Sequence, residues 1–445
     1  GHPCVFEALF ASRAAAASAH IEWAGAVYGF TLDVRYPDVG TCRDLAALAA
    51  PGYGDRQQVP PDLCRHNAAI DKAVLQIDHG ELGVAPVGSV ENPVEGIQRL
   101  LEEGCRQEDF LHNAQLAVCS YPYIACVIYA QLECLKDIPM LFAIKGAGHL
   151  AEYASAELQP WVLNSFERWL KSPTAMRRFV VLDHISIPIV HLAFGTSPLR
   201  VPFTAHYVLA LAGGVQCVQR ARQPKRLLLP NFHAAVPPND GAVIGVWCFT
   251  IKAMAPEWQM EHFEKSYAYR DLQRFSAALI FPWDWELVAF LELYRLGIPL
   301  LMPSDQYMHA YIAHVYMSMR NPRDWISSWH RRFTVLIPEH WKGLRWENES
   351  PYPLEDVRVP WIQPNWGDRF LMEQVVSWWK RTDFKIMQHV VQFGSLADML
   401  SQMRSLDVGL VCRRMEEVNE FEWRAAEQFY VQLHLAVLGI DVLQS

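Results

Sequence analysis

The chain has 445 residues, of which 51% are hydrophobic and 20% are charged. This length and apolar content exclude an intrinsically disordered chain and are typical of two domains of about 200 residues each. The formal net charge is -9 and the pI is near 6.0. Nucleic acid is therefore not an expected partner, because a surface that follows phosphates needs clustered Lys and Arg.

The ten cysteines include no CxxC pair and no Cys/His run at zinc spacing, so we expect no structural metal site. Eight of them precede residue 220, which fits one or two disulfides in the N-terminal half of a secretory protein as well as it fits buried free thiols. The sequence has no apolar run of 18 residues, so we expect no membrane span. The chain starts at Gly1 without Met, and the compartment stays unknown; the lumen of the ER or Golgi is favoured if a leader or anchor was removed.

Short apolar runs alternate with longer stretches of helical pattern along the chain. We expect buried strands at 82–87, 116–119, 138–144, 179–182, 227–229, 243–249, 277–281, 298–302 and 335–337. Because strands that alternate with helices usually pair in parallel, this pattern predicts an α/β protein with mainly parallel sheets.

The clearest break in this pattern is the segment LPNFHAAVPPNDG at 229–241, where Pro237, Pro238 and Gly241 interrupt any regular element. It predicts an N-terminal domain at 1–235 and a C-terminal domain at 236–414. The last segment, 415–445, has apolar residues at helical spacing on one face. We expect it to be a closing helix that packs back on a domain.

Two windows indicate that both halves follow one plan. A helical pattern that includes Glu133 precedes an Ile-Pro pair at 138–139 and an apolar run, and a pattern that includes Glu292 precedes an Ile-Pro pair at 298–299 and a second apolar run. Proline is tolerated at the first position of a strand. The sequence therefore predicts two Rossmann-like domains.

Two acids in the second window carry the clearest chemistry. Asp284 and Glu292 follow the expected strand 277–281 and lie eight residues apart on one predicted helix. The amide groups and dipole of a helix N-terminus favour phosphate, and an inward carboxylate two turns later can accept hydrogen bonds from ribose hydroxyls. This arrangement suits a nucleoside diphosphate. The alternative is a helix cap at Asp284 and a surface Glu292.

The same segment resembles the donor-site signature of retaining GT-B glycosyltransferases: an acid, seven residues, then Glu, followed by Gly five and Pro seven positions later. Asp284, Glu292, Gly297 and Pro299 stand at these spacings. The resemblance implies a GT-B fold, with Glu292 on the donor ribose, Asp284 as the catalytic residue near the transferred sugar, and Gly297 to Pro299 as the turn into the next strand.

The segment departs from the family pattern in two ways. Asp284 stands where most family members carry Glu, and bulky Trp283 and Trp285 flank it in place of small residues. These departures concern the sugar side of the site more than the nucleotide side.

Other candidate residues are assigned by position. Lys252 follows the expected strand 243–249 and would contact the donor diphosphate, although an exposed lysine is the commoner outcome. The segment KGAGH at 145–149 could approach the phosphates or be a plain turn. His149 and His184 are candidates for the acceptor side, although a core or surface histidine is commoner. A short stretch at 83–95 also resembles prephenate dehydratases, without a second matching motif.

The resemblance implies a transferase that uses a nucleotide-sugar as substrate, with no metal or other cofactor, and a glycan or protein hydroxyl as acceptor. A glycosyltransferase-like scaffold that has lost catalysis and binds protein partners is the alternative. The acid change at position 284 and the neighbouring tryptophans favour that alternative.

Overall fold

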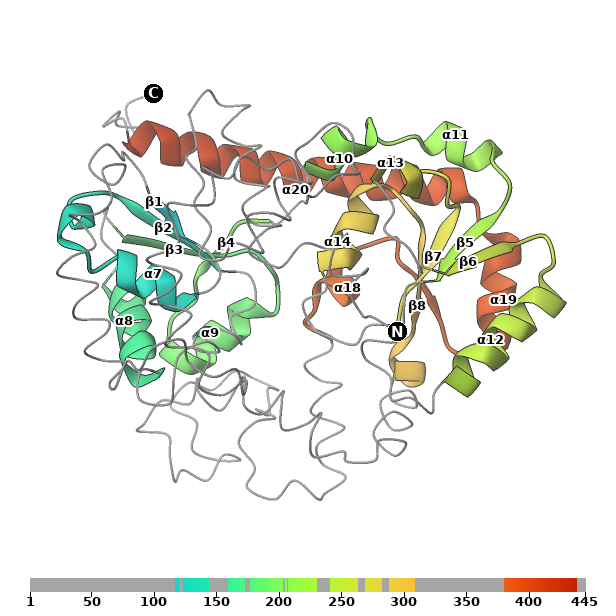
Figure 1. Cartoon of the computed structure of the whole chain (residues 1–445), viewed down its shortest axis with the longest axis horizontal. Coiled ribbons are helices and arrows are strands. Elements are labelled where there is room, and N and C mark those ends of the chain that lie inside the picture. The colour runs from blue at the N-terminus through green and yellow to red at the C-terminus, as the bar shows by residue number, and fades with distance from the viewer. Residues whose placement is uncertain are drawn as a thin grey trace, which may run out of the picture. The chain divides into compact units, whose positions relative to one another are not determined.

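A computed structural model describes residues 117–119, 123–144, 150, 159–172, 177–202, 205, 207–229, 241–262, 269–281, 288–308 and 380–437. The described residues at 117–202 and 427–437 belong to one compact unit, and those at 205–308 and 380–426 belong to the other. Each unit contains its own parallel sheet, and Figure 1 labels the elements of both.

The sheet of the first unit has the strand order β1-β2-β3-β4, and all of its pairings are parallel. Its strands are β1 (Ala117–Cys119), β2 (Met140–Ile144), β3 (Arg177–Val181) and β4 (Leu199–Arg200). The intervening helices are α7 (Tyr123–Tyr129), the short 3-10 helix η2 (Glu133–Leu135), α8 (Gln159–Lys171) and α9 (Ser186–Phe194).

Aromatic side chains fix α8 on this sheet. Phe142 of β2 stacks on Trp169 of α8 with ring centroids 4.8 Å apart, and it meets Phe166 edge to face at 5.8 Å. Phe142 and Phe166 are fully buried. Pairs of this geometry add about 0.5–1.5 kcal/mol to the effect of burial alone, so this cluster anchors the helix to the central strands.

The sheet of the second unit has the order β6-β5-β7-β8-β9, again with parallel pairings throughout. Its strands are β5 (Arg226–Leu229), β6 (Gln259–His262), β7 (Ala277–Leu279), β8 (Leu300–Pro303) and β9 (Val391–Phe393). In chain order this is 2-1-3-4-5, the arrangement of a doubly wound sheet in which the direction of winding reverses between β5 and β7.

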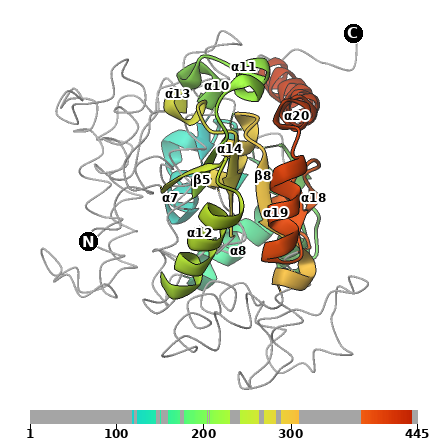
Figure 2. The same ribbon diagram turned by 90° about the vertical axis from the view of Figure 1, so that its right-hand side faces the viewer.

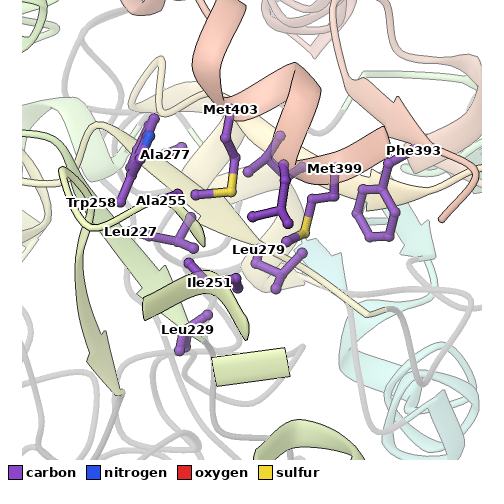
Figure 3. Close-up of a cluster of buried hydrophobic side chains, with 12 residues drawn as sticks. Leu227, Leu229, Ile251, Ala255, Trp258, Ala277, Leu279, Phe393, Met399 and Met403 are labelled. Atoms are coloured by element: carbon purple, nitrogen blue, oxygen red, sulfur yellow. The ribbon is translucent and has the colours of Figure 1, made fainter. Parts of the chain in front are cut away.

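Helices cover both faces of the second sheet (Figures 1 and 2). They are α10 (Tyr207–Ala212), α11 (Cys217–Arg222), α12 (Gly241–Met254), α13 (Tyr269–Leu272), α14 (Val288–Arg295), α18 (Asp383–Ile386), α19 (Leu396–Ser405) and α20 (Val408–Val437). On one face, Ile251 of α12 and Met399 and Met403 of α19 pack on buried side chains of β5, β7 and β8 (Figure 3). On the other face, Phe290 of α14 meets Phe384 of α18 at 5.4 Å.

Six of the expected strands are confirmed as β1, β2, β3, β5, β7 and β8. The expected strand at 243–249 is wrong, because these residues lie inside the helix α12. The expected strands at 82–87 and 335–337 lie outside the described residues, as does the stretch at 83–95. β5 pairs with β6 and β7, so it belongs to the second sheet, although a boundary at 235 would place it in the N-terminal domain.

The C-terminal helix begins at Val408, earlier than the expected 415, and a disulfide joins it to α11. The bond links Cys217 and Cys412, which are 195 residues apart in sequence. Cys126 and Cys134 are also disulfide-bonded, whereas Cys248 keeps a thiol whose pKa burial raises. Disulfides are therefore present, and the bond between Cys217 and Cys412 is not confined to the N-terminal half of the chain.

Candidate functional site

The candidate site lies at the carboxyl edge of the second sheet, where the winding reverses between β5 and β7. In doubly wound sheets ligands bind outside the carboxyl ends of the strands at this point. The segment after β7 carries Asp284, Trp283 and Trp285, and it lies outside the described residues, as does 230–240 after β5. The described part of the site is therefore the unit β7-α14-β8 and its surroundings.

Glu292 is held inside the protein. Its side chain is 0% exposed, so it is not the surface residue of the alternative expectation. The hydroxyl of Tyr269, from α13, donates a hydrogen bond of 2.8 Å to Glu292 Oε1, and Tyr269 itself is 3% exposed. A buried carboxylate without such bonds costs several kcal/mol, so this contact is part of what makes the inward position tolerable.

Gly297 ends α14 in a left-handed turn. Its φ is +66°, its N–H donates to the carbonyl of Tyr294 at 3.0 Å, and the next N–H, of Ile298, donates to the carbonyl of Leu293 at 3.2 Å. This is a Schellman motif, in which glycine adopts the positive φ without a Cβ penalty. A Cβ at this position would also meet Cys412 Sγ at 2.7 Å. The expected turn into the next strand is confirmed.

Pro299 comes directly before β8 and is buried. Its carbonyl accepts the N–H of Ala278 of β7 at 2.9 Å, and its missing N–H is no loss at the start of a strand. Pro139 does the same before β2, where its carbonyl accepts the N–H of Ala117 at 2.8 Å. In both halves, therefore, a proline precedes the strand and its carbonyl accepts an N–H from the neighbouring strand. They differ in the acid, because Glu133 is exposed beside Lys136.

Three aromatic rings lie together at the carboxyl ends of β7, β8 and β9. Phe281, Tyr307 and Phe393 have centroid separations of 5.8 to 6.4 Å. Next to them, Lys385 forms an ion pair with Asp305 at 2.6 Å. Phe393 is 0% exposed and belongs to the buried cluster of this sheet, and Phe281 and Tyr307 pack against that cluster, so the three rings close the core at this edge. None of these residues was a sequence candidate, because they come from three distant segments.

Two buried arginines lie near Gly297 in sequence or in space, and Arg220 bonds to the turn itself. Arg220 of α11 donates to the carbonyl of Leu296 at 3.0 Å and to Gln273 Oε1 at 2.6 Å, and it is 1% exposed. Burial lowers its pKa to about 9, so the side chain is still a cation at neutral pH. Burial also lowers the pKa of Arg295 to about 10, although Glu420 and Glu416 oppose the shift. The bond from Arg220 to the carbonyl of Leu296 helps to order the end of α14.

Lys252 is not at the carboxyl edge. It lies exposed in the last turn of α12, just before the chain enters β6, so it is near the amino ends of the strands. Its assignment to a diphosphate depended on a strand at 243–249, and that strand is a helix. The correction follows from geometry, because a helix that starts at the carboxyl edge of a parallel sheet ends at the opposite edge.

On the first unit, His184 follows the carboxyl end of β3 and is half-buried. Its neighbour Asp183 is fully buried and accepts the N–H of Ser186 at 2.8 Å, at the start of α9. His149 and the rest of the segment at 145–149 lie outside the described residues. His184 therefore stands at the edge expected for a ligand in its own sheet.

Within the described ranges, no group of three His, Cys, Asp or Glu side chains is placed to hold a metal ion. Among the helices described, none has both the length and the apolar character needed to cross a membrane. Comparison with protein families, with curated proteins and with solved structures finds no match to this chain.

Proposed function

We propose that this protein is a glycosyltransferase that moves a sugar from a nucleotide-sugar to a hydroxyl acceptor, with the nucleotide at the carboxyl edge of the second sheet. The observation that carries the proposal is the unit β7-α14-β8. Three of the four signature residues are described in it, with Glu292 turned inward, Gly297 in the left-handed turn and Pro299 directly before β8, and its first strand, β7, is one of the two between which the winding reverses.

In this proposal Glu292 accepts hydrogen bonds from the ribose hydroxyls and Asp284 stands beside the transferred sugar. The ribose hydroxyls would donate to the same carboxylate that accepts the hydrogen bond from Tyr269. In the reaction the bond between the anomeric carbon and the diphosphate oxygen breaks, and the acceptor oxygen forms the new glycosidic bond. The acceptor proton leaves with the nucleoside diphosphate or a nearby base.

A second candidate is a glycosyltransferase-like scaffold without catalysis that binds protein partners. One observation favours it: Glu292 is 0% exposed and already accepts a hydrogen bond from a buried tyrosine. A carboxylate that is satisfied within the protein is also what a structural role requires.

Nucleotide binding separates the two candidates. A thermal-shift screen with UDP, GDP, CMP and ADP comes first, because a ligand that binds only the native state raises its stability by mass action. Isothermal titration then compares wild type with Glu292→Gln. Charge-assisted hydrogen bonds contribute ~1.5–3 kcal/mol each, so the substitution should weaken binding by roughly ten- to a hundred-fold.

Glu133→Gln is the matched control, because Glu133 precedes the other Ile-Pro pair but is 77% exposed. It should leave the affinity unchanged. Equal affinities of wild type and Glu292→Gln would remove Glu292 from the site. No binding of any of the four nucleotides to wild type would favour the scaffold.

A further inference from the structure

The contact between Tyr269 and Glu292 joins the two helices that flank β7 in sequence. Tyr269 is the first residue of α13, which precedes β7, and Glu292 lies in α14, which follows it. Both side chains are buried, and the oxygen to oxygen distance is 2.8 Å. The pair therefore ties the helix that leads into β7 to the helix that follows it.

A tyrosine is suited to fix the orientation of a carboxylate. The torsion that turns a glutamate carboxylate is broad, with no sharp minimum to hold the two oxygens in place. The ring of Tyr269 is 3% exposed, so packing fixes its hydroxyl, and that hydroxyl then fixes Oε1. Recognition of two neighbouring hydroxyls needs acceptors held at defined positions, since hydrogen bonds weaken steeply away from linear geometry.

We infer that Tyr269 is a positioning residue, which holds the Glu292 carboxylate in the orientation that accepts the ribose hydroxyls of the nucleotide; this rests on the proposed function. The substrate class that follows is a ribonucleotide, read by its ribose hydroxyls. A nucleotide that lacks one of them loses part of the interaction that the oriented carboxylate provides.

The test compares binding of ribonucleotides and 2′-deoxyribonucleotides. Isothermal titration of wild type uses UDP, GDP, CMP and ADP and the 2′-deoxy form of each. We expect the nucleotide that binds best to be preferred over its deoxy form by roughly tenfold or more, since a site built to bond a hydroxyl rejects the analogue without it. Tyr269→Phe keeps the ring and removes the hydroxyl, and it should reduce this preference by about threefold or more.

Tyr294→Phe is the matched control. Tyr294 is a buried tyrosine of α14, and its hydroxyl donates to the carbonyl of Gln388 at 2.7 Å. Its removal takes away one buried hydrogen bond, to a neutral carbonyl, without removing the bond to Glu292. Both variants should lose thermal stability, but only Tyr269→Phe should change the preference for ribose.

A double variant tests whether Tyr269 acts through Glu292. In a Glu292→Gln background, the further change Tyr269→Phe should alter nucleotide affinity by less than about twofold, because coupled residues do not act additively. An unchanged ribose preference in Tyr269→Phe, with Glu292→Gln still weakened, would overturn the inference and leave the proposed function standing. Wild type that binds none of the nucleotides would overturn both.

Discussion

Replacing Gly297 by alanine tests the turn that ends α14 and leads into β8. Two costs add at this position. A residue with a Cβ at φ +66° costs about 1–2 kcal/mol. The new Cβ would also lie 2.7 Å from Cys412 Sγ and 3.0 Å from Val215 Cγ1, and overpacking of this kind costs about 1–3 kcal/mol. We therefore expect a loss of roughly 2–5 kcal/mol in the free energy of unfolding.

The chain offers a control that separates the two costs. Gly213 has φ +77°, and an added Cβ there would meet nothing within 4 Å. Gly213→Ala should therefore show only the backbone cost of about 1–2 kcal/mol. The assay is guanidinium unfolding of both variants and wild type, with the slope against denaturant checked for constancy.

The sulfur contact gives a further check. In a variant in which Cys217 and Cys412 are both alanine, Sγ is gone, and the cost of Gly297→Ala should fall toward that of Gly213→Ala. Equal losses for Gly297→Ala and Gly213→Ala in the wild-type background would refute the steric part of this reasoning.

Two further predictions concern the contacts around this turn. The joint change of Cys217 and Cys412 to serine should lower the free energy of unfolding by about 5 kcal/mol, as chain entropy predicts for so long a loop; Cys248→Ser is the control, and equal midpoints in guanidinium would contradict the prediction. Arg220→Lys should cost roughly 2–4 kcal/mol, because one ammonium group does not replace a planar fork bonded to several carbonyls. The same change at exposed Arg222 should stay within about 0.5 kcal/mol, and a similar loss for both variants would show that the buried bonds matter little.

The strands that the sequence predicts well are short apolar runs closed by turn residues. A strand that is buried on both faces of a parallel sheet is apolar at nearly every position, so it is recognised as such a run. The strands that it misses lie at sheet edges or are very short. β6 reads Gln-Met-Glu-His, and β4 has two residues. Half-exposed edge strands carry polar side chains, so the sequence contains no apolar run from which they could be predicted.

The helix α12 shows why an apolar run is ambiguous. Its 14 residues read GAVIGVWCFTIKAM, and the apolar part at 243–249 has neither helical nor alternating periodicity. Length is the signal that was available, since buried strands rarely exceed eight residues and the apolar pattern here continues to Met254. The wrong assignment of Lys252 to the donor diphosphate follows from this one error.

In the site, the residues predicted correctly are those whose role is local in sequence. The glycine turn and the proline before β8 follow from backbone rules at single positions. The partner of Glu292 could not be predicted in this way, because Tyr269 lies 23 residues away and no spacing relates them. The buried Arg220 is likewise placed by tertiary contacts with Gln273 and Leu296.

The two Ile-Pro units of this chain differ in the burial of the acid that precedes each pair, and this difference bears on which unit binds a ligand. Both begin a strand in the same way, with a proline carbonyl bonded to the neighbouring strand, so the backbone plan needs no acid in either unit. Glu133 is 77% exposed, where ionisation costs nothing, whereas Glu292 is 0% exposed, where an apolar side chain would pack at lower cost. The hydrogen bond from Tyr269 offsets part of that cost. The two units therefore share the start of a strand and differ in where the acid lies, and the inward acid makes the second unit the one in which we look for a ligand.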